Sequence, residues 1–137
     1  MTTLCDTNVL IDLYGADQQW TAWSRRAVAA ARRLGPLAIN PIIYAEFSIG
    51  YDSVDAVDSV LDVRVFERDA LPWTAGFDAA KAFVAYRRQG GEKRSPLPDF
   101  YIGAHALQRG YRILTRDTSR YRAYFPDLEI ISPETHP

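Results

Sequence analysis

The chain has 137 residues, of which 47% are hydrophobic and 24% charged, the balance of a globular protein rather than a disordered or fibrous one. Its single cysteine, Cys5, excludes an internal disulfide and a cysteine-rich zinc site. No apolar run reaches the roughly 20 residues needed to cross a bilayer, and the first residues lack the pattern of a signal peptide. We therefore expect one cytoplasmic domain over residues 1–137, with no membrane contact.

The formal net charge of −1 is divided unevenly along the chain. Residues 1–78 contain 6 Lys and Arg against 11 Asp and Glu, whereas residues 79–137 contain 10 against 6. A basic second half can present a phosphate-facing surface within a nearly neutral protein. A solvated charged face explains the same distribution, so charge alone does not indicate nucleic acid.

Short apolar segments alternate with longer amphipathic or alanine-rich segments. We expect strands at 3–5, 37–39, 63–66, 112–115 and 128–131, and helices at 20–34, 41–50, 52–61, 72–89, 98–108 and 119–125. Asn40 is placed to cap the second of these helices, and Trp73, Phe77, Ala80 and Val84 form the apolar face of the 72–89 helix. The alternation predicts a three-layer α/β fold, with a largely parallel central sheet flanked by helices, and leaves the strand order open.

Glu46 is the only ionisable carboxylate or base in the helix at 41–50, which is apolar nearly all round and should be largely buried. It shares a stripe with Ile42, Ala45 and Ile49. Burying a carboxylate costs several kcal/mol unless a partner or a metal compensates. A place at the helix rim and a structural salt bridge are the alternatives to a functional role.

Asp99 lies in the first turn of the helix at 98–108, where a negative charge suits the helix dipole. That capping role is the structural alternative. Asp99 also heads a stripe formed by Ile102, Gly103 and Ala106, which should face the core. The stripe would direct this carboxylate toward the edge of the sheet.

Asp6 and Asp117 each follow an expected strand, the position at which open parallel sheets place their ligand sites. Turn formation is the structural alternative for both aspartates. Together with Glu46 and Asp99 they form an acidic, all-oxygen set without a histidine or cysteine partner, which suits Mg²⁺ or Mn²⁺. The chemistry typical of such a set is hydrolysis of a phosphodiester.

Four motifs in register resemble those of the PIN-domain nucleases, and in length and closing segment the chain looks like the VapC-type toxins of toxin–antitoxin pairs. The motifs are Leu4-Cys5-Asp6-Thr7-Asn8, Asn40-Pro41-Ile42-Ile43-Tyr44-Ala45-Glu46, Pro98-Asp99-Phe100-Tyr101-Ile102-Gly103 and Leu114-Thr115-Arg116-Asp117. The resemblance implies a PIN-like fold and a magnesium site made of Asp6, Glu46, Asp99 and Asp117, with Mn²⁺ as a substitute. Thr7, Asn8 and Thr115 would orient carboxylates or water.

The expected activity is sequence-selective cleavage of RNA, with tRNA or rRNA as substrate. Phosphate contacts are expected from Arg87, Arg88, Lys93, Arg94, Arg116 and Arg120. The resemblance further implies a homodimer silenced by a small antitoxin. An arginine of that antitoxin could enter the acidic pocket beside an apolar groove, for which Trp20, Trp23 and Tyr44 are candidates unless they belong to the core.

Three alternatives remain open at this point. A PIN nuclease could process RNA without any antitoxin. A catalytically silent PIN module could bind RNA or assemble with other proteins, although the intact acidic motifs count against it. A receiver-like or haloacid-type phosphatase fold also uses strand-end aspartates, but the residues that follow Asp6 do not match the phosphatase motif.

Overall fold

The computed structural model describes residues 1–137, in which five short strands alternate with seven helices. The strands are β1 (Thr3–Cys5), β2 (Leu37–Ile39), β3 (Phe66–Arg68), β4 (Arg112–Leu114) and β5 (Ile130–Ile131). The helices are α1 (Thr7–Tyr14), α2 (Thr21–Leu34), α3 (Pro41–Ser48), α4 (Val54–Val60), α5 (Trp73–Arg88), α6 (Pro98–Arg109) and α7 (Ser119–Tyr124). No helix is long and apolar enough to cross a membrane.

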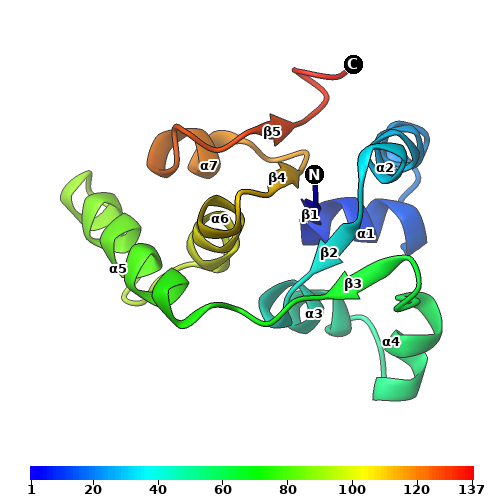
Figure 1. Ribbon diagram of the computed structural model, residues 1–137. Helices are drawn as coiled ribbons and strands as arrows, with labels where there is room; N and C mark the ends of the chain where they lie inside the picture. Colours follow the sequence, from blue (N-terminus) through cyan, green and yellow to red (C-terminus); the bar gives the residue numbers. More distant parts are fainter.

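The five strands form one sheet in the order β3-β2-β1-β4-β5, and every neighbouring pair is parallel. Leu4 of β1 lies opposite Ala38 on one side and Ile113 on the other. Figure 1 shows α6 and α7 on one side of the sheet and α1 and α2 on the other, with α5 packed outside α6. The three-layer α/β prediction is confirmed, and the sheet is entirely parallel.

Polar residues occupy the carboxyl ends of four neighbouring strands. Asp69 follows β3, Asn40 follows β2, Asp6 follows β1 and Thr115 follows β4. The chain moves from β1 toward β3 and then returns to the opposite side of β1, so the strand order reverses between β1 and β4. Parallel α/β sheets bind their ligands at such a reversal, outside the carboxyl ends of the strands. The topology therefore directs attention to the ends of β1 and β4.

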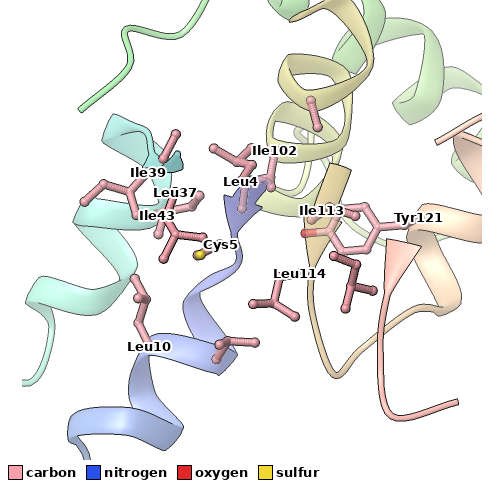
Figure 2. Close-up of a cluster of buried hydrophobic side chains, with 14 of the residues drawn as sticks. Leu4, Cys5, Leu10, Leu37, Ile39, Ile43, Ile102, Ile113, Leu114 and Tyr121 are labelled. Carbon is pink, nitrogen blue, oxygen red and sulfur yellow. The ribbon is translucent and has the colours of Figure 1, made fainter. Parts of the chain in front are cut away.

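The core is built on the central strands, since all residues of β1, β2 and β4 are buried. Figure 2 shows Leu4 and Cys5 of β1 packed between Ile113 and Leu114 of β4 and the residues of β2 and α3. Tyr121 of α7 enters the same cluster, fully buried, although its hydroxyl is polar. A buried phenol needs a hydrogen-bond partner, and its partner belongs to the candidate site.

The predicted start of α3 is confirmed. Asn40 caps this helix by accepting a hydrogen bond from the Ile43 backbone N–H at 2.9 Å, and Pro41 occupies the first turn. A different helix, α6, ends at Gly110, which adopts a positive φ of 69°.

The strand expected at 63–66 begins later in the structure, at Phe66. The Asp62 side chain accepts a hydrogen bond from the Arg64 backbone N–H at 2.8 Å and thereby forms a turn. β3 consequently begins at Phe66, and only this residue of the expected segment is in the sheet.

Two expected apolar faces point toward solvent. In α5 the buried residues are Ala75, Ala79 and Ala82, whereas Trp73 is 97% exposed and Phe77 is 63% exposed. The small alanines allow α5 to pack closely on α6, so the large residues are left outside.

In α3 the buried residues are Ile43 and Phe47, so the stripe that contains Glu46 lies at the surface. Ile49 of this stripe is 87% exposed. The prediction of a largely buried α3 is therefore wrong.

Candidate metal centre

Asp6 is the most constrained carboxylate of the site. It is the N-cap of α1, and its Oδ1 accepts a hydrogen bond from the Thr7 backbone N–H at 2.8 Å. Oδ2 accepts from Thr115 Oγ1 at 2.9 Å, from Tyr121 Oη at 2.8 Å and from Asn8 Nδ2 at 3.3 Å. Only 4% of the residue is exposed, so these donors replace most of the water that an ionised carboxylate would otherwise bind.

Asn8 ties the loops after β1 and β4 together. Its Nδ2 donates to Thr115 Oγ1 at 3.0 Å, and its Oδ1 accepts from the Arg116 backbone N–H at 2.9 Å. Thr115 Oγ1 in turn receives a hydrogen bond from the Asp117 backbone N–H at 3.1 Å. This network fixes the relative position of the two strand ends and of the residues that follow them.

Glu46 reaches the site from α3. Its Oε1 accepts a hydrogen bond from Thr7 Oγ1 at 2.8 Å, so Thr7 touches Asp6 through its backbone and Glu46 through its side chain. The Glu46 side chain is half-buried at the rim of the helix, rather than in the core. Glu46 therefore lies at the helix rim, which was the structural alternative, and Thr7 links it to Asp6.

Asp99 and Asp117 complete the acidic set from α6 and from the loop after β4. Asp99 lies in the first turn of α6, and its Oδ2 is 3.4 Å from Nη1 of Arg120. The stripe below Asp99 is buried as expected. Asp117 is exposed, and its Oδ1 accepts from Ser119 Oγ at 3.1 Å.

The charges of the four carboxylates act on one another. Burial, followed by the charge of Asp99, raises the pKa of Asp6 from 3.8 to about 6, although its hydrogen-bond donors oppose the shift. Burial also raises the pKa of Glu46, and Asp99 adds to this effect. The pKa of Asp99 is raised by burial and by Asp117, against the opposing effect of Arg120. The four residues are therefore one repelling group centred on Asp99.

The donor set fits a hard divalent cation. All four side chains offer oxygen, and a bound cation would relieve both their mutual repulsion and the cost of burying Asp6. No three of the chain's acidic, histidine or cysteine side chains converge closely enough to chelate an ion as they stand. Asp6 and Glu46 are instead engaged in hydrogen bonds, and Asp99 in an ion pair, with other side chains of the protein.

The six basic residues expected to bind phosphate occupy different environments. Arg88, Lys93 and Arg94 are exposed around the segment between α5 and α6. Arg87 is exposed too, but its Nη1 donates to the Gly91 and Lys93 carbonyls and so braces that segment. Arg120 contacts the site directly, because it forms an ion pair with Asp99.

Arg116 differs from the other five because it is paired with a buried carboxylate. Its guanidinium binds both oxygens of the buried Asp12, with Nη2 and Oδ1 2.9 Å apart, and lies over the ring of Trp20. Ser24 donates a further hydrogen bond to Asp12 at 2.8 Å. The geometry therefore gives Arg116, which we expect to contact phosphate, a structural carboxylate partner in Asp12.

The three aromatic residues considered as a groove do not form one. Trp23 is buried, and its Nε1 donates to the His136 carbonyl. Trp20 packs under Arg116, and Tyr44 packs under Arg68 elsewhere in the fold. An apolar groove does border the site beside Glu46, but it is built from other residues, among them Ile11, Phe47 and Ile49.

Tyr121 is the site residue that the sequence did not reveal. Its hydroxyl reaches Asp6 because α7 packs tightly on α6, where a Cβ at Gly103 would lie 2.6 Å from the Phe125 ring and 3.2 Å from the Tyr121 ring. A glycine inside a helix indicates close approach by another element. Gly103 was therefore the available signal, but it does not identify which residue approaches.

Comparison with known proteins agrees with this architecture. The PIN domain family model matches residues 3–126. The VapC ribonuclease Y4jK of Sinorhizobium fredii is 30% identical over 93% of this chain and 94% of its own length. The VapBC-1 structure from nontypeable Haemophilus influenzae aligns with a TM-score of 0.72 at 18% identity, covering 96% of this chain and 98% of that one. A toxin–antitoxin complex from Klebsiella pneumoniae aligns with a TM-score of 0.62 at 26% identity, covering 96% and 97%. With its motifs, its fold and these matches in agreement, the chain belongs to the PIN domain family of metal-dependent nucleases, in the VapC branch.

Proposed function

We propose that this chain, acting as one PIN-like domain over residues 1–137, is a cytoplasmic magnesium-dependent endoribonuclease and the toxin of a toxin–antitoxin pair. Mn²⁺ would be able to substitute for Mg²⁺, and cleavage would depend on the sequence of the RNA. The observation that carries the proposal is the group of carboxylates around Asp99, in which burial and then the charge of Asp99 raise the pKa of Asp6 to about 6. A relative named as a VapC ribonuclease and similar structures of toxin–antitoxin complexes support it.

Asp6, Glu46, Asp99 and Asp117 would hold the ion. A bound divalent cation supplies positive charge that stabilises the transferring phosphate and favours deprotonation of the attacking water. Thr7, Thr115, Asn8 and Tyr121 donate to the carboxylates and so favour their ionised form, the form that binds a cation.

Arg120 is the cation best placed for the scissile phosphate. It pairs with Asp99 at 3.4 Å and remains 44% exposed, so it can exchange a carboxylate for a phosphate oxygen. Arg87, Arg88, Lys93 and Arg94 would contact phosphates farther along the RNA, because their segment leads directly into the helix that carries Asp99. Such contacts position the strand without reading its sequence.

The test is cleavage of RNA by the purified protein. Cleavage should require Mg²⁺ or Mn²⁺, stop with excess chelator and be poor with Zn²⁺. Asp99→Asn is the control for a contaminating nuclease, since it should fold normally and leave RNA intact. Full cleavage in chelator by the wild type, in preparations where Asp99→Asn leaves RNA intact, would contradict the proposed mechanism.

An apolar groove of about 470 Å³ beside Glu46 is a suitable surface for the antitoxin. It lies between α1 and the end of α3, and its apolar lining consists of Ile11, Tyr14, Phe47, Ile49 and Tyr51. Exposed ion pairs contribute only about 0–1 kcal/mol each, so an inhibitor that inserts an arginine among the carboxylates also needs an apolar anchor. Co-expression with a partner reading frame, followed by co-purification, tests this role, and Ile49→Asp should weaken capture.

The exposed stripe of α5 is a suitable face for a second copy of the chain. Trp73, Phe77, Ala80 and Val84 lie at helical spacing and are all exposed. Contiguous exposed apolar residues on a soluble protein mark an interaction surface. Sedimentation should show a dimer for the wild type and a monomer for Trp73→Ser combined with Phe77→Ser.

A further inference from the structure

His105 is a buried histidine that the proposed reaction does not use. It lies in α6, six residues after Asp99, and is not exposed to solvent. Both ring nitrogens have partners, since Nδ1 lies 3.0 Å from Asn40 Nδ2 and Nε2 lies 3.3 Å from Asp69 Oδ2. Tyr111 donates to the same Asp69 oxygen at 2.6 Å. The cluster therefore joins α6 to the carboxyl ends of β2 and β3.

Asn40 fixes the direction of these hydrogen bonds. Its Oδ1 accepts from the Ile43 backbone N–H, so its amide nitrogen, which can only donate, faces His105. Nδ1 of His105 must then accept, and Nε2 carries the proton that is donated to Asp69. Burial lowers the pKa of His105 below its ordinary value, in the direction that favours this neutral arrangement. The three side chains thus satisfy one another in a single arrangement.

The same Asn40 side chain touches the two helices that carry Glu46 and Asp99. It caps α3, which bears Glu46, and it binds His105 on α6, which bears Asp99. The two helices are in direct contact. A change at Asn40 or His105 would therefore alter how α3 sits against α6, and with it the spacing of the two carboxylates.

We propose that Asn40, His105 and Asp69 form a positioning cluster that sets the separation of Glu46 from Asp99 and thereby the affinity of the site for a divalent cation. The inference rests on the proposed function, because it requires these two carboxylates to share one ion. Outer hydrogen-bond partners of metal ligands typically change metal affinity 10–100-fold. The cluster acts one step farther out, through the helices, so the lower end of that range is expected.

Asn40→Ser separates the two roles of Asn40. Serine caps a helix about as well as asparagine, but its shorter side chain cannot reach His105. Ser53→Ala is the matched control, since Ser53 Oγ caps α4 by accepting from the Ala56 N–H at 3.1 Å, and α4 carries no residue of the site. His105→Leu is a second variant that removes both ring hydrogen bonds and leaves the cap of α3 intact.

Each full-length protein is melted without metal and then titrated with Mn²⁺ by calorimetry. We expect Asn40→Ser and His105→Leu to bind Mn²⁺ about tenfold more weakly. The Tm of Asn40→Ser should fall no further than that of Ser53→Ala, which should bind Mn²⁺ like the wild type. Wild-type affinity in either folded cluster variant would overturn this inference and leave the proposed function standing. A wild-type chain that binds no Mn²⁺ would overturn both.

Discussion

The hydroxyl of Tyr121 donates a hydrogen bond to Oδ2 of Asp6 at 2.8 Å, which joins the last helix of the chain to the end of the first strand. Tyr121→Phe removes only this hydroxyl. Because the bond lowers the pKa of Asp6, its loss should make Asp6 harder to ionise and weaken Mn²⁺ binding about tenfold. Tyr124→Phe is the matched control, since its hydroxyl donates to Gln89 at the surface. Equal Mn²⁺ affinities for the two variants would show that the Tyr121 hydroxyl serves packing alone.

Asp6 should make the metal-free protein less stable as the pH rises. Its folded pKa of about 6 exceeds the ordinary 3.8, so the folded state binds this proton more tightly than the unfolded chain does. The contribution of Asp6 to stability is therefore greatest below about pH 4, falls as the pH rises through 6 and is absent above that range, a change of up to about 3 kcal/mol.

Asp6→Asn removes the ionisation and retains an oxygen that can cap α1. In chelator at pH 7.5 this variant should unfold at a higher denaturant concentration than the wild type, and the difference should shrink toward pH 4.5. Asp127→Asn, at an exposed position, controls for the change in net charge. A stability difference that does not vary with pH would contradict the raised pKa.

Glu46→Gln should abolish cleavage while preserving the fold. A glutamine oxygen can still accept the hydrogen bond from Thr7 Oγ1, and the loss of one negative charge relieves repulsion from Asp99. Cleavage assays and thermal melts of Glu46→Gln and of the exposed control Glu67→Gln provide the comparison. Normal cleavage by Glu46→Gln would restrict this residue to the structural rim role.

Substitution of Arg116 should lower the stability of the protein, whereas substitution of Arg88, Lys93 and Arg94 should weaken RNA binding. Arg116→Ala leaves Asp12 buried with only Ser24 as partner. Because Arg116 is partly exposed to solvent, the loss should be smaller than for a fully buried ion pair. We expect the free energy of unfolding to fall by about 2 kcal/mol. The effect of this substitution on the salt dependence of RNA binding should be small. A stable Arg116→Ala protein with a flattened salt slope would restore Arg116 as a phosphate contact.

Neutralising Arg88, Lys93 and Arg94 together should weaken RNA binding and flatten the salt slope by about 0.7 for each lost contact to single-stranded RNA. Stability should change little because the three side chains are exposed. Arg87 is left in place because it braces the segment through the Gly91 and Lys93 carbonyls. An unchanged slope would move the RNA path toward Arg120 and α7.

The sequence by itself determined the class of fold and predicted four acidic positions as the candidate site. Strand and helix periods, the cap at Asn40 and the strand-end places of Asp6 and Asp117 are local properties, which follow from residues near one another in the chain. The burial of the stripe under Asp99 also followed from helical spacing. Strand order was not determined, because it depends on contacts between segments far apart in sequence.

Only the tertiary structure decided which faces are buried and which charges are paired. The apolar stripe of α5 turned outward because the alanines on its other face pack more closely on α6, and helical period alone cannot choose between two such faces. The pairing of Arg116 with Asp12 and of Tyr121 with Asp6 joins residues separated by more than one hundred positions. Such pairs form only when the sheet places the ends of β1 and β4 side by side, because nothing in either segment specifies the other.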